Sequence, residues 1–182
     1  MPITHLLKDL IKLKLNYNIG EKTWFGTGGK SKVFLLINDE TSLRLLMKFL
    51  PKSIPIFLIG AGSNILIRDG GLNAITIKLG AGFKKINFLK NEKTLEVGAA
   101  VKDFEFSKYC FENSICDFEF LRGIPGTIGG NIRMNAGCFG HTISDRLLSC
   151  GVLKRNGNLL TVPKKKIIFK YRTSSLPKDS II

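Results

Sequence analysis

Two glycine-rich segments constrain the fold of this chain more than any other feature. The first is Gly60-Ala61-Gly62-Ser63-Asn64, which directly follows the short apolar run from Ile56 to Ile59. Small residues after a buried strand allow several backbone N–H groups to point at one anion, and Ser63 and Asn64 add side-chain donors. The segment lacks the third glycine of the dinucleotide-binding G-x-G-x-x-G motif and the Lys-Ser or Lys-Thr of a P-loop. It predicts an oxyanion-binding turn, with a plain tight turn as the alternative.

The second segment carries five glycines and a proline. It begins with Gly123-Ile124-Pro125-Gly126, continues through Gly129-Gly130 and ends at Gly137. Because no charged residue lies between Gly123 and Gly130, the stretch is a poor solvated loop. Glycines here would let the main chain approach a bulky, flat ligand closely, whereas the alternative interpretation is a buried structural crossover.

A third feature lies near the end of the sequence, where Tyr171-Arg172 precedes Thr173-Ser174. The planar guanidinium of arginine binds a carboxylate or a phosphate with two parallel hydrogen bonds. Taken by itself, however, Arg172 is more simply explained as a surface residue. This motif gains meaning only in combination with the glycine segments.

Residues for other kinds of chemistry are sparse. The histidines are His5 and His141, no carboxylate pair lies in either glycine segment, and neither Ser63 nor Ser174 has an identifiable histidine partner. These patterns disfavour a glycosidase or a hydrolase. The four cysteines lack C-x-x-C spacing, so we expect reduced thiols and no metal site; they are Cys110, Cys116, Cys138 and Cys150.

The net charge of +14 favours anionic ligands through long-range attraction. The basic residues are scattered rather than clustered, so nucleic acid is not an expected partner. A nucleic-acid-binding module is a weaker alternative, which only the net charge supports. No apolar run approaches the roughly 20 residues that cross a bilayer, and the N-terminus does not have the pattern of a secretion signal. The sequence therefore predicts a cytoplasmic protein without a membrane partner.

Hydrophobic periodicity predicts an α+β protein. We expect helices over residues 5–15, from a cap at Asn38 or Asp39 to Leu50, and over 103–113. The expected strands are 33–37, 56–59, a meander of 74–79, 84–89 and 94–97, and a hairpin of 147–153 with 159–162. Asn156-Gly157 predicts a type I′ turn in that hairpin, because both central positions of such a turn need positive φ.

In combination, these motifs resemble the UDP-N-acetylenolpyruvoylglucosamine reductase family of flavoenzymes. The matching stretches follow the family's order and approximate spacing, and they are residues 23–29, 60–71, 119–130, 134–137 and 171–174. The resemblance implies an α+β fold, a vanillyl-alcohol-oxidase-type (PCMH-type) FAD-binding domain. Its two α+β subdomains, residues 1–80 and 81–182, would hold the flavin between them.

The resemblance also implies a reaction and a set of site residues. NADPH reduces FAD in this family, and the flavin then passes hydride to the enolpyruvyl group of a UDP-sugar. Arg172 matches the residue that stabilises charge on the substrate carboxylate, and Tyr171 would contact the substrate. The positions that match flavin-contacting loops are Gly60, Ala61, Gly62, Ser63, Asn64, Gly123, Ile124, Pro125, Gly126, Gly129, Gly130 and Gly137.

The chain also departs from the family pattern. Family members continue for roughly another hundred residues into a substrate-binding domain, which supplies a proton-donating Ser and an assisting Glu. Neither has a counterpart here, and Gly26 stands where the family usually has Arg. We therefore expect FAD binding with weak or absent turnover, and a non-catalytic flavin-binding remnant is the alternative.

The missing domain also leads to an expectation about surfaces and partners. It would leave apolar surface exposed around Phe169, Tyr171 and Ile181-Ile182. We therefore expect either aggregation or dependence on a separate partner chain that carries the missing substrate domain. A UDP-sugar substrate is the other expected partner.

Overall fold

The computed structural model describes residues 11–91 and 93–182, and the chain divides into two compact units. Unit 1 comprises the described residues up to Phe83 together with the short segment 155–158. Unit 2 comprises the described residues of 84–154 and of 159–182. In the described part of the chain, no helix has the length and apolarity needed to span a bilayer.

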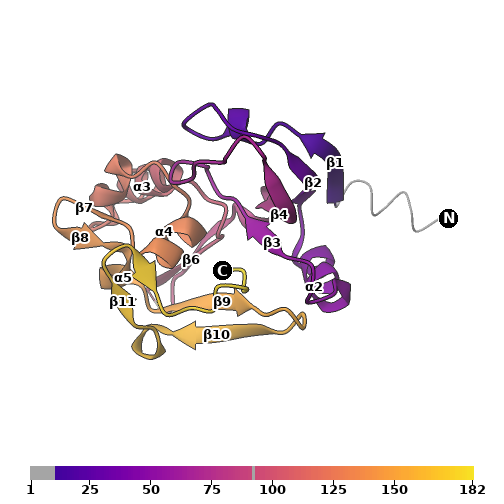
Figure 1. The fold of residues 1–182 in the computed structure, drawn as a ribbon. Coiled ribbons are helices and arrows are strands. Elements are labelled where there is room, and N and C mark those ends of the chain that lie inside the picture. Colours follow the sequence, from indigo (N-terminus) through magenta and orange to yellow (C-terminus); the bar gives the residue numbers. More distant parts are fainter. Residues whose placement is uncertain (1–10, 92) are drawn as a thin grey trace. The chain divides into compact units, whose positions relative to one another are not determined.

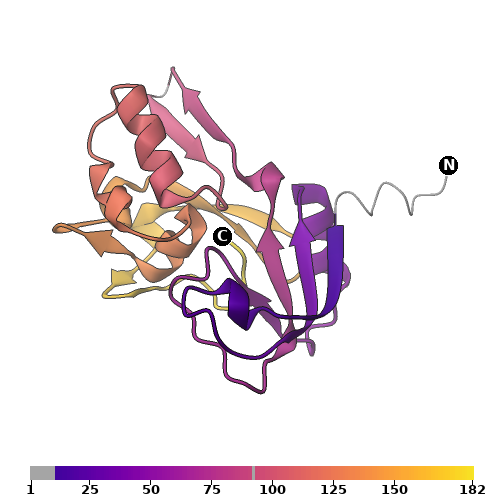
Figure 2. The same ribbon diagram turned by 90° about the horizontal axis from the view of Figure 1, so that it is seen from above.

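Unit 1 is built on a four-stranded sheet with the order β1-β2-β4-β3 (Figures 1 and 2). β1 pairs antiparallel with β2, while β4 runs parallel to both β2 and β3. A single helix, α2, joins β2 to β3, and two 3-10 turns, η1 and η2, complete the unit. The bounds are β1 Ile11–Tyr17, η1 Gly20–Lys22, β2 Ser31–Ile37, α2 Glu40–Phe49, β3 Ile56–Leu58, β4 Leu72–Leu79 and η2 Ala81–Phe83.

The helix α2 confirms the prediction from local sequence. Its N-cap is Asp39, whose side chain accepts a hydrogen bond from the Ser42 backbone N–H at 2.8 Å. Such a cap satisfies one of the amides left without a partner in the first turn. Leu43 and Met47 lie on the buried face, and the helix ends before Pro51.

The predicted helix over residues 5–15 is wrong where the structure describes it. Ile11–Tyr17 is strand β1, and Leu13 pairs with Leu35 of β2. The first part of the predicted helix, with His5, lies outside the described residues. The alternation of Leu13 and Leu15 with lysines also fits the two-residue period of a strand, and pairing with β2 decided between the two structures.

Unit 2 contains short helices and two-stranded sheets rather than one large sheet. The predicted meander is interrupted, because β4 belongs to the sheet of unit 1 whereas β5 and β6 form their own hairpin. The bounds are β5 Ile86–Leu89, β6 Thr94–Val97, α3 Asp103–Glu112, η3 Glu119–Gly123, α4 Ile128–Met134, β7 Gly137–Cys138, β8 His141–Thr142, α5 Ile143–Arg146, β9 Ser149–Leu153, β10 Leu159–Pro163, η4 Lys164–Lys166, β11 Phe169–Lys170 and β12 Thr173–Ser174.

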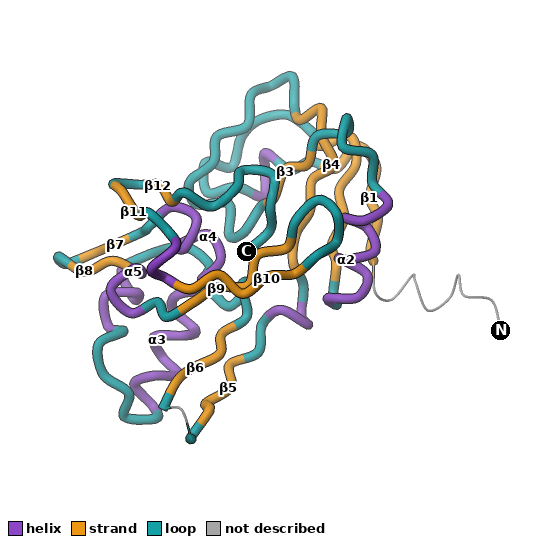
Figure 3. Tube along the Cα trace, turned by 90° about the horizontal axis from the view of Figure 1, so that it is seen from below, coloured by secondary structure: helices purple, strands orange, loops and turns teal. Residues whose placement is uncertain are grey.

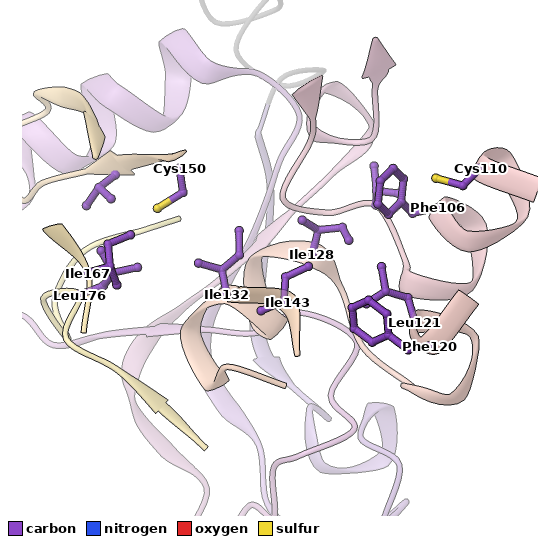
Figure 4. Packing of buried hydrophobic residues seen from close by; sticks show 12 residues of the cluster. Phe106, Cys110, Phe120, Leu121, Ile128, Ile132, Ile143, Cys150, Ile167 and Leu176 are labelled. Carbon is purple, nitrogen blue, oxygen red and sulfur yellow. The ribbon is translucent and has the colours of Figure 1, made fainter. Parts of the chain in front are cut away.

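One apolar cluster forms the core of unit 2 (Figure 4). Phe106 of α3, Leu121 of η3 and Ile132 of α4 are all buried in it. Cys110 and Cys150 are buried there as free thiols, and Cys116 and Cys138 are also free. Helices α3 and α4 are therefore held by apolar burial, which is the dominant favourable contribution to folding.

The predicted β9–β10 hairpin is present, but its predicted type I′ turn is wrong. Residues 154–158 connect the strands, and only Gly157 has a positive φ, of 79°. The buried Arg155 donates to the backbone oxygens of Pro51 at 2.7 Å and Ile54 at 3.0 Å, within unit 1. Contacts that are distant in sequence therefore shape this connection, not a local turn preference.

Candidate functional site

The first glycine segment follows β3 and is built around Gly62. Gly62 has a φ of 76°, and a Cβ at this position would lie 3.2 Å from both the Lys22 backbone oxygen and the Thr23 Cα. The Gly62 oxygen also accepts a hydrogen bond from the Trp24 backbone N–H at 3.0 Å. Backbone conformation and close packing therefore both require glycine here.

Free backbone donors distinguish this segment from an ordinary tight turn. None of the four amides from Gly60 to Ser63 donates to a backbone carbonyl in the part of the chain that the structure describes. Gly60, Ala61 and Ser63 are half-buried and Asn64 is exposed. Consecutive amides without internal acceptors can bind an oxyanion.

A cavity of about 420 Å³ lies beside the same segment in unit 1. Asn64 is in its wall, together with Phe57, Ile65, Leu72 and the charged Arg68. The hollow is open to solvent and has a mostly apolar lining with the polar groups of Asn64 and Arg68. The first glycine segment therefore borders this space through Asn64, while its binding of an oxyanion stays a prediction.

The second glycine segment combines a turn with a helix that the sequence analysis did not find. Gly123 ends η3, and the Gly126 N–H donates to the Ile124 oxygen at 3.1 Å. Thr127 then caps α4, its hydroxyl accepting from the Gly130 N–H at 3.4 Å, so Gly129 and Gly130 lie in a helix and not in a loop. Thr127 was the available signal for a helix start, although two glycines in the first turn disfavour a helix.

Two buried polar side chains behind this segment were missed by sequence reasoning. Asp103, the first residue of α3, and Asn131 of α4 are both buried, and their side-chain oxygens approach Gly126. A Cβ on Gly126 would lie 2.5 Å from Asp103 Oδ2 and 2.8 Å from Asn131 Oδ1. Glycine is thus required at 126 because these side chains fill the space.

The protonation of Asp103 follows from this burial. Desolvation raises the pKa of Asp103 to about 7, against smaller opposing effects of the Asn131 side chain and the Gly126 backbone. Removing a carboxylate from water disfavours its charged form. The carboxyl group of Asp103 is therefore mostly protonated, and so uncharged, below about pH 7.

Tyr171 and Arg172 form the two-residue turn between β11 and β12. Phe169 pairs with Ser174 and Lys170 with Thr173. Tyr171 is 91% exposed, and Arg172 is exposed with a φ of 53°, an uncommon conformation for a residue that is not glycine. The two predicted substrate-contacting residues therefore project from the tip of a short hairpin.

Unit 2 brings several of the predicted site residues together through α4. The Asn135 side chain, at the end of α4, donates to the Lys170 oxygen at 3.4 Å, and the Ser174 hydroxyl donates to the Arg133 oxygen at 3.0 Å. Gly137 follows on β7. Hydrogen bonds thus connect the segment from Gly123 to Gly137 with the hairpin that carries Arg172. That Gly60–Asn64 binds the same ligand as these two segments stays a prediction.

The predicted apolar exposure near the end of the chain is only partly present. Tyr171 is exposed and Phe169 is half-buried, but Ile181 is only 2% exposed. Ile181 forms a bridge with Leu153, and the two residues exchange backbone hydrogen bonds of 2.8 and 3.0 Å. Pairing with β9 is the physical reason why Ile181 does not contribute to an exposed patch.

Comparison with known proteins gives a family and a set of relatives. Residues 31–163 match the family described as FAD binding domain. The chain is 44% identical over 182 residues to UDP-N-acetylenolpyruvoylglucosamine reductase of Rickettsia typhi and 43% identical to that of Rickettsia prowazekii. Each alignment covers 100% of this chain but 60% of the relative, so the chain spans about 60% of the length of these curated proteins.

Two solved structures have a similar fold. UDP-N-acetylenolpyruvylglucosamine reductase from Thermus caldophilus matches with a TM-score of 0.79 and 24% identity, over 94% of this chain and 59% of that one. Berberine bridge enzyme from Eschscholzia californica matches with a TM-score of 0.60 and 15% identity, over 86% of this chain and 36% of that one. At these identities, the likeness concerns the fold alone.

Proposed function

Because the chain belongs to the FAD binding domain family and has its PCMH-type α+β fold, we propose that it binds FAD and provides the flavin domain of a UDP-N-acetylenolpyruvoylglucosamine reductase. The unpaired amides from Gly60 to Ser63 carry this proposal. The proposed activity is the NADPH-dependent reduction of UDP-N-acetylglucosamine enolpyruvate to UDP-N-acetylmuramate, a step of peptidoglycan synthesis in the cytoplasm. The proposed subdomains are residues 1–80 and 81–182.

The residues present fit a dinucleotide cofactor. The amides of Gly60, Ala61, Gly62 and Ser63, with the Asn64 side chain, would hold the pyrophosphate, because converging N–H groups stabilise anionic oxygens. The second segment would let the main chain pass close to the flavin ring, and its residues are Gly123, Ile124, Pro125, Gly126, Gly129, Gly130 and Gly137. When bound and reduced by NADPH, the flavin would supply the hydride that reduces the enolpyruvyl double bond.

Arg172 is the proposed catalytic residue. Its guanidinium would bind the substrate carboxylate and stabilise the charge that develops there during hydride transfer. Tyr171 would contact the substrate from the same turn. Removing one preorganised donor of this kind typically costs about 2.7–4 kcal/mol in the barrier.

Flavin binding is tested by titrating the purified chain with FAD. We expect a saturable change in flavin absorbance and quenching of flavin fluorescence. A matched titration with riboflavin, which lacks the pyrophosphate, should give much weaker binding because the first glycine segment would have no anion to hold. A colourless protein and no saturable change with FAD would overturn the proposed function.

Activity is tested by adding NADPH and UDP-N-acetylglucosamine enolpyruvate to the FAD-loaded chain and following NADPH oxidation and product formation. We expect FAD binding with weak or absent turnover of the chain alone, and any turnover that is measured should fall by about 100-fold or more in Arg172→Ala. FAD binding without turnover would favour a flavin-binding role that is non-catalytic without a further domain. Adding a separately purified substrate-binding domain of a Rickettsia relative then tests whether activity is restored by a partner chain.

A further inference from the structure

Arg133 of α4 binds the chain that follows the Arg172 hairpin at several points. Its Nη1 donates to the oxygens of Leu176 at 2.9 Å and Pro177 at 2.8 Å. Its Nη2 donates to the Ser180 oxygen at 2.8 Å and to the Ser180 hydroxyl at 3.3 Å. One guanidinium thus binds three main-chain carbonyls within five residues of the chain.

The main chain of Arg133 also holds the hairpin itself. The Ser174 hydroxyl donates to the Arg133 oxygen at 3.0 Å, so this one residue contacts both β12 and the segment after it. Figure 3 shows β11 and β12 beside α4. A second hydrogen bond to the hairpin comes from the C-cap of α4, where the Asn135 side chain donates to the Lys170 oxygen at 3.4 Å.

The hairpin is too small to hold its own position. β11 and β12 have two residues each, and an isolated two-stranded hairpin is marginally stable even when longer. Arg172 sits at its tip with a φ of 53°, a conformation that persists only where the surroundings impose it. The hydrogen bonds with α4 contribute to the order of this turn.

We propose that Arg133 is a positioning residue that fixes the Arg172 turn: its side chain binds the carbonyls of Leu176, Pro177 and Ser180, and its main-chain oxygen accepts the hydrogen bond of the Ser174 hydroxyl. This inference rests on the proposed function only in its consequence for substrate binding. An arginine is suited to the role because its planar group offers five N–H donors in a rigid arrangement, whereas a lysine offers one compact ammonium group. Burial lowers the pKa of Arg133, and the carbonyl oxygens around the guanidinium compensate for its lost hydration.

The first test needs no cofactor. Hydrogen exchange is measured on the full chain and on Arg133→Lys at the amides of Ser175 and Ile181, which donate to the oxygens of Ile168 and Leu153. We expect both amides to exchange about tenfold faster or more in the variant, while the exchange rate of the Phe106 amide of α3 is unchanged.

The matched control variant is Arg146→Lys, because Arg146 forms an exposed ion pair with Asp117 in the same unit. Unchanged exchange at both amides in Arg133→Lys would overturn the proposal, whether or not the chain binds FAD.

The second test asks whether Arg133 acts through Arg172. On the FAD-loaded chain, Kd is measured from the flavin spectrum for UDP-N-acetylglucosamine enolpyruvate and for UDP-N-acetylglucosamine, which lacks the carboxylate. We expect Arg133→Lys to raise Kd for the enolpyruvyl compound about tenfold relative to the other sugar, with Kd for FAD unchanged. In an Arg172→Ala background the same change should have no further effect, because residues that act as one unit are not additive.

The outcomes separate the two proposals. A wild-type chain that binds neither FAD nor the sugars would overturn the proposed function, and hydrogen exchange would still decide the role of Arg133. Equal weakening of both sugars by Arg133→Lys, or additive effects with Arg172→Ala, would mean that Arg133 does not act by positioning Arg172.

Discussion

The buried carboxyl group of Asp103 and the side-chain amide of Asn131 converge on Gly126, each within 3 Å of the place that a Cβ would occupy. Asp103 begins α3 and Asn131 lies in α4, so this contact joins the two helices behind the second glycine segment. The arrangement makes the stability of unit 2 sensitive both to pH and to the size of residue 126.

Asp103 should make the chain less stable as the pH rises. The pKa of Asp103 is about 7 in the folded chain and near its ordinary value of 3.8 when unfolded, so between these pH values the folded state binds more protons. The free energy of unfolding should therefore fall from about pH 4 to about pH 7 and then level off, by on the order of 4 kcal/mol. Asp103→Asn should remove this contribution and be more stable than the wild type at pH 8.

Urea unfolding at a series of pH values measures this effect as the difference between the two proteins. Asp145→Asn is a control in which the removed contribution to stability has the opposite pH dependence. The Thr142 backbone N–H donates to Asp145 at 2.7 Å and lowers its pKa, so the stabilisation from Asp145 is lost as the pH falls. Parallel profiles for the wild type and Asp103→Asn between pH 4 and 7 would contradict the prediction.

Gly126→Ala should destabilise the chain through steric overlap. The new methyl group would meet Asp103 Oδ2 and Asn131 Oδ1, and both side chains are buried with little room to move. We expect a loss of about 1–3 kcal/mol in the free energy of unfolding, the usual cost of overpacking. Gly70→Ala is the matched control, because nothing lies within 4 Å of its Cβ position and its φ is not positive. Equal denaturation midpoints for the two variants would argue against this account.

Gly62→Ala should lower the free energy of FAD binding by more than it lowers the free energy of unfolding. A methyl group at Gly62 would press on Lys22 and Thr23 and displace the amides of the first glycine segment. We expect Kd for FAD to rise at least about tenfold. Gly26→Ala controls for backbone strain, since Gly26 has a similar φ of 65° but nothing within 4 Å of its Cβ position. Each variant should lose about 1 kcal/mol of stability from that strain, and a matching loss of flavin affinity in Gly26→Ala would refute the specific role of Gly62.

Leu121→Ala should destabilise unit 2 strongly. Leu121 is 0% exposed within the apolar cluster shown in Figure 4, so truncation removes buried contacts and leaves a cavity. The expected loss is about 2–5 kcal/mol. Phe111→Ala removes a larger side chain from the same unit, but Phe111 is 83% exposed, and its variant should stay within about 0.5 kcal/mol of the wild type. Thermal unfolding of the two variants side by side provides the comparison.

Prediction from the sequence succeeded where a local signal and the tertiary structure agreed. Asp39 caps α2 as expected, and Pro51 follows its end. It failed where a distant partner decided the structure. Leu13 and Leu15 lie in β1 because the backbone of this segment pairs with β2, and the connection at Asn156-Gly157 is shaped by the hydrogen bonds of Arg155 to residues about 100 positions away.

The flavin-domain fold was predictable from the sequence through the resemblance of its ordered motifs to a known flavoenzyme family, and the glycines that carry these motifs are visible in the sequence because backbone conformation or close packing requires them. The tertiary structure alone decided which polar side chains are buried together. Asp103 and Asn131 are 28 positions apart, and Arg133 binds main-chain oxygens 43 to 47 positions away. Every residue carries a carbonyl oxygen, so nothing in the sequence indicates which of them an arginine will bind, and only folding brings the partners together.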